Sequence, residues 1–275
     1  LAFVFTLPSF AQTSADTVFR SSPVDTHTVL NQPPPLVDYD VFGSDTALVE
    51  AAALFGSEEA APALSKLGNL ASSEQVQQWA VEADTYTPVL RAHDRYGRRV
   101  DEVDFHPAWH ALMNEAVSAG LHAAPWASAD PSAHVTRAAG FLTWYQSEAG
   151  HGCPISMTYA AVPALNVDPF VAAEWVPGLT SSTYDFGLRS PASKAGLIAG
   201  MSMTEKQGGS DVRTNTTTAT PIPGEPGAYT LDGHKWFCSA PMSDLFLVLG
   251  QTEGGLTCFV VPRVLADGTR NVFRI

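Results

Sequence analysis

The 275-residue sequence has few cysteines, few basic residues and no long apolar run. Cys153, Cys238 and Cys258 lie far apart, and neither their number nor their spacing suits a disulfide framework or a metal site. This usage favours a reducing compartment, so we expect a cytoplasmic protein. No apolar run approaches the roughly 20 residues that cross a bilayer, and we expect no membrane partner.

Basic residues are scarce, since 15 Lys and Arg stand against 28 Asp and Glu, which gives a formal net charge of -13. A nucleic-acid-binding face needs clustered Lys and Arg. The one dense basic patch, residues 95–99, is followed at once by acidic side chains, and we interpret it as a solvated turn. The composition, 45% hydrophobic and 16% charged, is typical of a globular chain with a buried core.

Both ends of the sequence are abrupt. Residues 1–7 are apolar and precede Ser9-Phe10-Ala11, which resembles a signal core with a small-x-small cleavage site, but there is no initiating Met and no basic leader. A translated upstream segment or a fragment boundary explains this start as well as export does. Residues 271–275 have the pattern of a strand that is just beginning. We therefore expect a fragment of a longer protein.

The residues from Ser44 to about Asn166 are patterned as helices. Start signals occur at Ser44-Asp45, at Ser72 with Gln75, at Pro107, at Asp130-Pro131 and at Cys153-Pro154. After Gly187 the pattern changes to short apolar runs separated by Gly, Pro and Asp, which predict strands at 196–203, 214–220, 228–231, 235–239, 245–250 and 256–261.

Helices followed by strands predict an α+β fold, with a helical bundle first and an antiparallel β domain after it. Asp232-Gly233 is predicted to form a hairpin turn within that sheet.

Two motifs in the strand-rich part resemble those of the acyl-CoA dehydrogenase flavoprotein family. The first, T-E-x-x-x-G-S-D, is present as Thr204, Glu205, Gly209, Ser210 and Asp211. The second, G-x-K-x-aromatic-x-[ST], is present as Gly233, Lys235, Phe237 and Ser239.

The resemblance is closest to the alkylation-response (AidB-like) branch of that family, in the stretches 26–33, 105–110, 203–211 and 234–237. Lys206-Gln207-Gly208 replaces the Pro-x-Ala of ordinary members, which also favours this branch. The resemblance implies an unmatched extension at residues 1–24, an N-terminal helical domain at 25–195 and a truncated middle β domain at 196–275. It also implies that the C-terminal helical domain of the family is absent.

The resemblance implies FAD as the cofactor, bound at the corner that follows the first strand. Glycine lets the backbone approach a ligand, because no Cβ intervenes. Thr204 would lie near the N5/O4 edge, Ser210 would donate to the pyrophosphate, Phe237 would pack on the ring and Ser239 would donate a hydrogen bond. The complete set of expected cofactor-binding residues is Met201, Ser202, Met203, Thr204, Gly208, Gly209, Ser210, Phe237, Cys238 and Ser239.

A simpler reading of the corner is a tight turn in which the glycines supply only positive φ. Glu205 and Asp211 are expected to bond local backbone, and Trp236 is expected to pack on the strand face opposite Phe237. His106 and His110 are spaced i, i+4, but His106 precedes a proline and the glutamate of a zinc-protease motif is missing, so we expect no metal site.

The reaction that the family implies is α,β-dehydrogenation of an acyl-CoA thioester, in which a carboxylate base takes the α-proton and the flavin accepts hydride from the β-carbon. No residue of this sequence is recognisable as that base, so we expect no catalytic residue here, weak FAD binding by the isolated chain and no turnover. The implied partners are acyl-CoA or a related small molecule and, when the protein is full length, further copies in a dimer or tetramer.

Two rival functions remain open at this point. The alkylation-response branch implies a flavoprotein that binds double-stranded DNA through the missing C-terminal domain and protects it from alkylating agents, with little acyl-CoA activity. Alternatively, the fold serves as an interaction module without flavin.

Overall fold

The computed structural model describes residues 26–275, so the apolar stretch at residues 1–7 lies outside the described residues. The described residues 26–35 belong to a separate unit and contain no helix or strand. The second unit, Leu36–Ile275, holds all the elements discussed below. Within residues 26–275, no helix has the length and apolar character that a membrane span requires.

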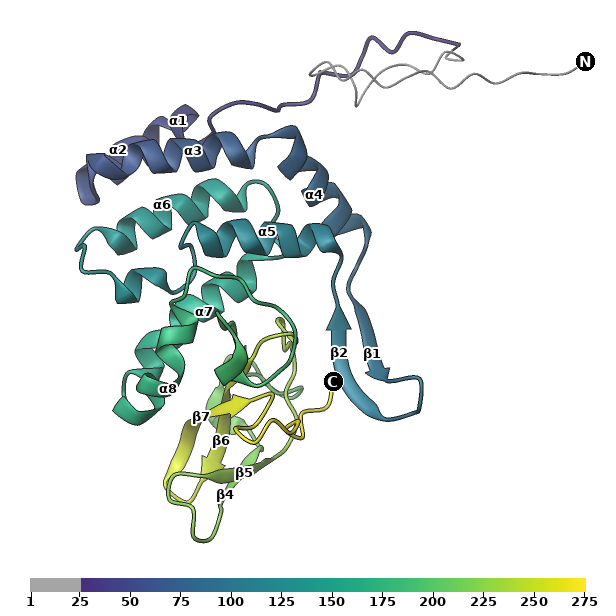
Figure 1. The fold of residues 1–275 in the computed structure, drawn as a ribbon, viewed down its shortest axis with the longest axis vertical. Helices are drawn as coiled ribbons and strands as arrows, with labels where there is room; N and C mark the ends of the chain where they lie inside the picture. Colours follow the sequence, from purple (N-terminus) through teal and green to yellow (C-terminus); the bar gives the residue numbers. More distant parts are fainter. Residues whose placement is uncertain (1–25) are drawn as a thin grey trace, which may run out of the picture. The chain divides into compact units, whose positions relative to one another are not determined.

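The first part of this second unit is mainly helical (Figure 1). The α-helices are α1 (Val41–Ser44), α2 (Thr46–Phe55), α3 (Ala61–Ala71), α4 (Glu74–Thr85), α5 (Pro107–Ser118), α6 (Ala133–Tyr145), α7 (Gly152–Leu165) and α8 (Pro169–Leu179). Short 3-10 turns occur at Glu58–Ala60, Ala124–Ala127, Pro191–Ser193 and Val212–Thr214.

The helix starts lie at or close to the predicted signals: α5 begins at Pro107 as predicted, whereas α6 begins at Ala133 and α7 at Gly152. Asp45 caps α2, since its side chain accepts a hydrogen bond from the Leu48 amide at 3.0 Å. The predicted cap of α4 at Ser72 is wrong by one residue, because Ser73 accepts from the Val76 amide instead. The Ser72 hydroxyl is engaged elsewhere, bonded to the backbone of Tyr39.

A β-hairpin that the sequence did not predict interrupts the helices between α4 and α5. Its strands β1 (Val89–His93) and β2 (Arg99–Asp104) pair antiparallel, and Figure 1 shows them extending away from the helices. The basic patch lies at the turn of this hairpin, where Asp94 Oδ1 accepts from the amides of Tyr96 and Arg98. The prediction of a solvated turn at residues 95–99 is therefore confirmed, although its two strands were missed.

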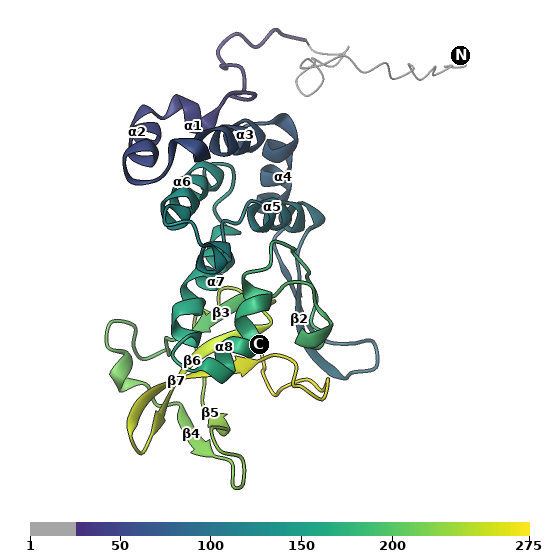
Figure 2. The same cartoon turned by 60° about the vertical axis from the view of Figure 1, so that its left-hand side comes forward.

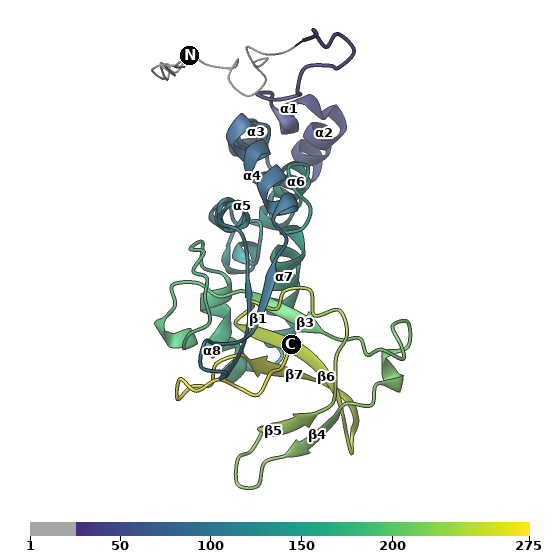
Figure 3. The same ribbon diagram turned by 90° about the vertical axis from the view of Figure 1, so that its right-hand side faces the viewer.

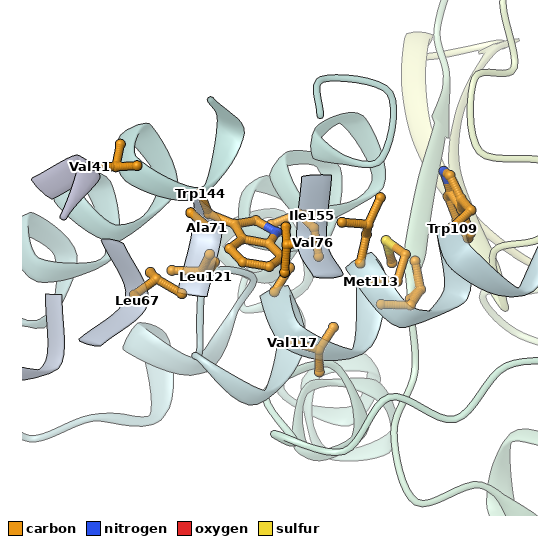
Figure 4. Close-up of a cluster of buried hydrophobic side chains, with 13 residues drawn as sticks. Val41, Leu67, Ala71, Val76, Trp109, Met113, Val117, Leu121, Trp144 and Ile155 are labelled. Atoms are coloured by element: carbon orange, nitrogen blue, oxygen red, sulfur yellow. The ribbon is translucent and has the colours of Figure 1, made fainter. Parts of the chain in front are cut away.

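The helices share a hydrophobic core around Trp144, whose side chain is 1% exposed (Figure 4). Helices α3 to α7 all contribute to this core. A second cluster joins α7 and α8 to the sheet through Leu165, Leu179, Leu197 and Leu245, and Figure 2 shows these two helices beside β3, β6 and β7. The sheet therefore lies directly against the end of the helical part.

The order predicted from the sequence, helices first and a sheet afterwards, is confirmed. The strands are β3 (Ala199–Ser202), β4 (Thr218–Pro221), β5 (Tyr229–Asp232), β6 (Leu245–Thr252) and β7 (Gly255–Pro262). The sheet is mixed rather than wholly antiparallel, because β3 and β4 both run parallel to β6 while β5 and β7 pair antiparallel with β4 and β6.

Strand β6 organises the sheet. Strand β7 pairs with β6 along its full length, so β3 and β4 must share the opposite edge. Strand β3 pairs with Leu245–Val248, and the chain returns to that edge at Thr218, opposite Gln251. Beyond this point β4 and β5 continue as a hairpin past the end of β6 (Figure 3). Residues 203–217, which we call the excursion loop, thus leave and rejoin one edge of one strand.

Two local predictions in this part are wrong. Residues 235–239 form no strand, because Phe237 adopts a positive φ of 59° that breaks the extended backbone. Asp232-Gly233 is not a hairpin turn, since the chain leaves the sheet there; the turn between β4 and β5 lies at residues 222–228.

Candidate functional site

The excursion loop carries the first motif and is closed at its base. The side-chain amide of Asn215 donates to the Met203 carbonyl at 2.7 Å. Next to this bond, the Glu205 carboxylate accepts hydrogen bonds from the backbone amides of Thr216 and Thr217 at 2.8 and 2.9 Å. The start and the end of the loop are therefore held together, which leaves residues 206–211 as its tip.

Glu205 is buried, with an exposed fraction of 1%, and its carboxylate accepts from six donor groups. These are the amides and hydroxyls of Thr216 and Thr217, the Gln207 side-chain amide at 2.5 Å and the Lys235 ammonium at 3.0 Å. Burial by itself raises the pKa of Glu205, but these hydrogen bonds outweigh it and hold the pKa far below its usual range. Glu205 is thus a permanent anion with a structural role, as the sequence suggested.

The second motif lies against the excursion loop. The Trp236 amide donates to the Thr204 carbonyl at 2.8 Å, and the Lys206 amide donates to His234 Nε2 at 3.3 Å. Nearer the sheet, the Ser202 hydroxyl and the Cys238 thiol are 3.0 Å apart. The two motifs, more than twenty residues apart in the sequence, are therefore brought side by side.

Gly233 has a packing role in this arrangement. A Cβ at this position would lie 2.4 Å from Thr217 Oγ1 and 2.7 Å from the Thr217 Cα, which no side chain can occupy. Only glycine lets residues 233–235 cross the base of the loop closely enough for Lys235 to reach Glu205.

The predicted cofactor residues differ in their exposure. Ser202 is buried in β3, whereas Gly209, Ser210, Phe237 and Ser239 lie on the surface. The remaining predicted residues are partly buried, namely Met201, Met203, Thr204, Gly208 and Cys238. The structure thus gathers all ten on and around two adjoining segments, 201–210 and 237–239.

Phe237 is unusual in two respects. It is a bulky residue with a left-handed backbone, which is rare outside glycine. Its ring is 74% exposed and contacts the Trp236 ring edge-on, with the ring centroids 5.4 Å apart. The expectation that Trp236 and Phe237 occupy opposite faces of a strand is therefore wrong. Trp236 packs instead under the Lys206 ammonium, which lies 4.9 Å from the ring centroid.

Several donors of the two segments have no partner within residues 26–275. They are the hydroxyls of Thr204 and Ser210 and the backbone amides of Gly209, Ser210, Phe237 and Ser239. Gly208 and Gly209 both have ordinary φ, and a Cβ on Gly209 would meet nothing closer than Thr204 Cγ2 at 3.9 Å. The simpler reading is therefore right about a tight turn, which the Gly208 amide closes by donating to the Glu205 carbonyl at 3.1 Å, but wrong in giving these glycines positive φ.

Asp211 and the two histidines have local roles. Asp211 Oδ1 accepts from the Arg213 amide at 3.2 Å and caps the 3-10 turn there. His106 caps α5 by accepting from the Ala108 amide, whereas His110 Nδ1 lies 2.9 Å from the Tyr184 hydroxyl. The part of the chain that the structure describes contains no group of three or more His, Cys, Asp or Glu side chains able to hold a metal ion.

The base of the loop depends on residues that the sequence analysis missed. Asn215, Thr216 and Thr217 supply five of the hydrogen bonds that close it. The signal for them was the run of hydrogen-bonding side chains Asn215-Thr216-Thr217-Thr218 directly after the first motif. Two cavities of about 520 and 820 Å³ lie among the helices and beside β2, and none of the ten predicted residues lines them.

Comparison with known protein families agrees with this geometry. Residues 200–272 match the acyl-CoA dehydrogenase middle domain, which covers the sheet and both motifs. Residues 31–186 match the N-terminal domain of the adaptive response protein AidB. The chain therefore belongs to the AidB family within the acyl-CoA dehydrogenases.

Individual relatives show the same relationship. The chain is 46% identical to AidB of Escherichia coli (strain K12) over 252 residues, which are 91% of this chain and 46% of that protein. Caenorhabditis elegans ACDH-11, solved in complex with C11-CoA, superposes with a TM-score of 0.72 at 23% identity, over 90% of this chain and 44% of that one. A Mycobacterium smegmatis glutaryl-CoA dehydrogenase in complex with FADH2 has the same fold, with a TM-score of 0.53 at 15% identity over 82% and 49% of the two chains. The chain spans about half the length of these relatives.

Proposed function

We propose that the protein is an FAD-dependent oxidoreductase of acyl-CoA dehydrogenase type, and that the two adjoining segments form its flavin-facing side. The observation that carries this proposal is the set of donors from Thr204, Gly209, Ser210 and Phe237, on neighbouring stretches of chain, that have no partner among the described residues. An isoalloxazine edge and a pyrophosphate are rich in acceptors, so they suit this set of donors. We also propose the division into a helical domain at 25–195 and a middle domain at 196–275.

The residues present fit FAD in shape as well. The space beside Gly209 is open although the backbone there does not require glycine, which suits close approach of a ligand. The exposed Phe237 ring, held by a strained backbone, offers an apolar face to a flat ring system.

Each residue would then have a defined task. The Thr204 hydroxyl would donate to the polar edge of the ring, as would the Ser239 hydroxyl in exchange for its bond to the Phe237 carbonyl at 3.3 Å. The Ser210 hydroxyl and the Gly209 amide would bind phosphate oxygens. Met201, Met203 and Cys238 would supply apolar contact beside Ser202. When bound, FAD would accept hydride from the β-carbon of the acyl thioester as a base takes the α-proton. No residue of this chain is assigned as that base.

An acyl-CoA substrate is proposed from the relatives, one of which was solved with C11-CoA. The relatives extend beyond the match, so substrate, oligomeric state and turnover are properties to test in the protein expressed from its complete reading frame.

The decisive experiment is a Gly209→Ala substitution in that protein, with Gly254→Ala as its matched control. Both glycines have ordinary φ and room for a Cβ, since the nearest atoms would be 3.9 and 3.6 Å away. Both variants should unfold within about 0.5 kcal/mol of the wild type. Gly209→Ala should weaken FAD binding at least tenfold, measured by quenching of flavin fluorescence, while Gly254→Ala should not. A wild-type protein that stays colourless and binds no added FAD would refute the proposal.

A second candidate function follows from the name of the family, adaptive response protein. In this reading the flavoprotein binds double-stranded DNA and protects it from alkylation. The net charge of -13 argues against a DNA-binding face on this chain, so we propose that the binding lies outside it. Gel-shift titrations of the complete protein and of this chain, at 50 and 200 mM salt, would distinguish the two readings.

A further inference from the structure

The ion pair between Glu205 and Lys235 links one of the two segments to which we assign the flavin, 201–210, with the residues that directly precede the other, 237–239. Glu205 belongs to the excursion loop and Lys235 to the second motif, and their side chains are 0% and 9% exposed. Resting on the proposed function, we infer that this pair is a positioning device, which sets the separation of the two segments and the charge balance beside the flavin.

Lys235 is not needed to satisfy the carboxylate. A carboxylate offers about four acceptor sites, and Thr216 and Thr217 alone supply four donors. The base of the loop is thus closed by Asn215 and the two threonines without Lys235. Lys235 adds the ion pair that connects Glu205, at the base of the loop, to the second motif.

Lys235, in turn, depends on Glu205. The Lys235 ammonium is nearly buried, and Glu205 is its only ion-pair partner in the described part of the chain. A buried ammonium without a counter-charge is strongly destabilised. Because Gly233 seats this segment on Thr217 and Trp236 bonds Thr204, a shift of Lys235 would move the residues on both sides of it.

The pair is electrically neutral, so replacing one partner leaves a net positive charge and replacing the other leaves a net negative charge. In Glu205→Gln the positive charge of Lys235 would be left uncompensated, and it would favour the anionic reduced flavin. In Lys235→Met the negative charge of Glu205 would be left uncompensated, and it would disfavour that form. A residue that acted only by holding the fold together would not produce shifts of opposite sign.

The test measures FAD affinity and the midpoint potential of bound FAD in the complete protein, using Glu205→Gln, Lys235→Met and the double variant. We expect each single variant to weaken FAD binding about tenfold or more, to raise the potential for Glu205→Gln and to lower it for Lys235→Met. The double variant should return the potential toward that of the wild type. Lys235→Arg, which keeps the charge, should rescue both quantities. Lys194→Met breaks another buried pair, with Asp244 at 2.5 Å, and serves as the control for lost stability alone.

The outcomes separate this inference from the proposed function. Failure of the wild type to bind FAD refutes the proposed function. Wild-type binding together with unchanged potentials, or with shifts of the same sign, refutes the positioning role alone. If Glu205→Gln does not fold, the comparison of Lys235→Met with Lys235→Arg tests the positioning role. Both of these variants leave the four threonine donors in place.

Discussion

Gly233→Ala offers the sharpest test of how the two motifs are packed. The new Cβ would lie 2.4 Å from Thr217 Oγ1 and 2.7 Å from the Thr217 Cα and Cβ, so either Thr217 or the 233–235 segment must move. Thr217 cannot move freely, because it donates twice to Glu205 and its carbonyl accepts from the Gln251 amide at 2.7 Å.

The expected cost follows from these contacts. Overpacking of this kind costs about 1–3 kcal/mol, and loss of one hydrogen bond to Glu205 adds about 1 kcal/mol. We therefore expect Gly233→Ala to lower the free energy of unfolding by about 2–4 kcal/mol, a large share of the total for a domain. With a urea m-value of about 2–3 kcal/mol/M, the midpoint should fall by about 1 M.

The assay is equilibrium unfolding in urea, followed both by the fluorescence of the six tryptophans and by far-UV circular dichroism. Gly254→Ala, whose Cβ would meet only Thr252 Oγ1 at 3.6 Å, should change the free energy by less than about 0.5 kcal/mol. If Gly233→Ala is as stable as Gly254→Ala, residues 233–235 do not cross Thr217 as described, and the link between the two motifs loses its support.

Two further predictions concern the helical part. Trp144 Nε1 donates to His151 Nε2 at 2.6 Å, and His151 Nδ1 lies 2.6 Å from Glu148 Oε2, so Trp144→Phe would leave a buried acceptor and a small void. Urea unfolding should show a loss of about 2–4 kcal/mol, whereas Trp126→Phe, where the ring is 37% exposed, should lose about 1 kcal/mol or less; equal losses would contradict this. Burial lowers the pKa of His122 to about 4, against the opposing bond to the Ser181 carbonyl. The unfolded chain therefore takes up a proton below about pH 6.5 that the folded chain does not, and stability should fall by up to about 3 kcal/mol between pH 6.5 and 4. His122→Gln should remove this part of the slope in urea titrations, and an unchanged slope would show that His122 is not its source.

The helical part was largely predictable because helix signals are local. Caps such as Asp45 and the apolar spacing along each helix act within one or two turns of chain. The β1–β2 hairpin escaped prediction because the apolar residues of its strands do not alternate regularly with polar ones. Arg91 pairs with Glu102 and Asp104 across the hairpin, and Val89 is exposed, so no alternation of buried and exposed positions marks either strand.

The candidate site was predictable only in part. The two motifs indicated which stretches matter, but the bond pattern around Glu205 depends on donors 11 to 30 residues away along the chain, such as Thr216 and Lys235. No local pattern encodes such contacts. Residues 235–239 have the short apolar run of a strand, yet the side-chain bond of Lys235 and the left-handed backbone of Phe237 prevail over it.

The shared edge of β6 has a consequence for variation and engineering. Since β3 and β4 dock on the same edge and the chain between them is clasped at its base, the tip at residues 206–211 can be lengthened, shortened or exchanged while every strand keeps its register. The sheet is thus a fixed scaffold, and the tip at residues 206–211 is the part that can vary. New ligand preferences can therefore be introduced there by grafting a short peptide, without redesign of the strands β3, β4 and β6 around it.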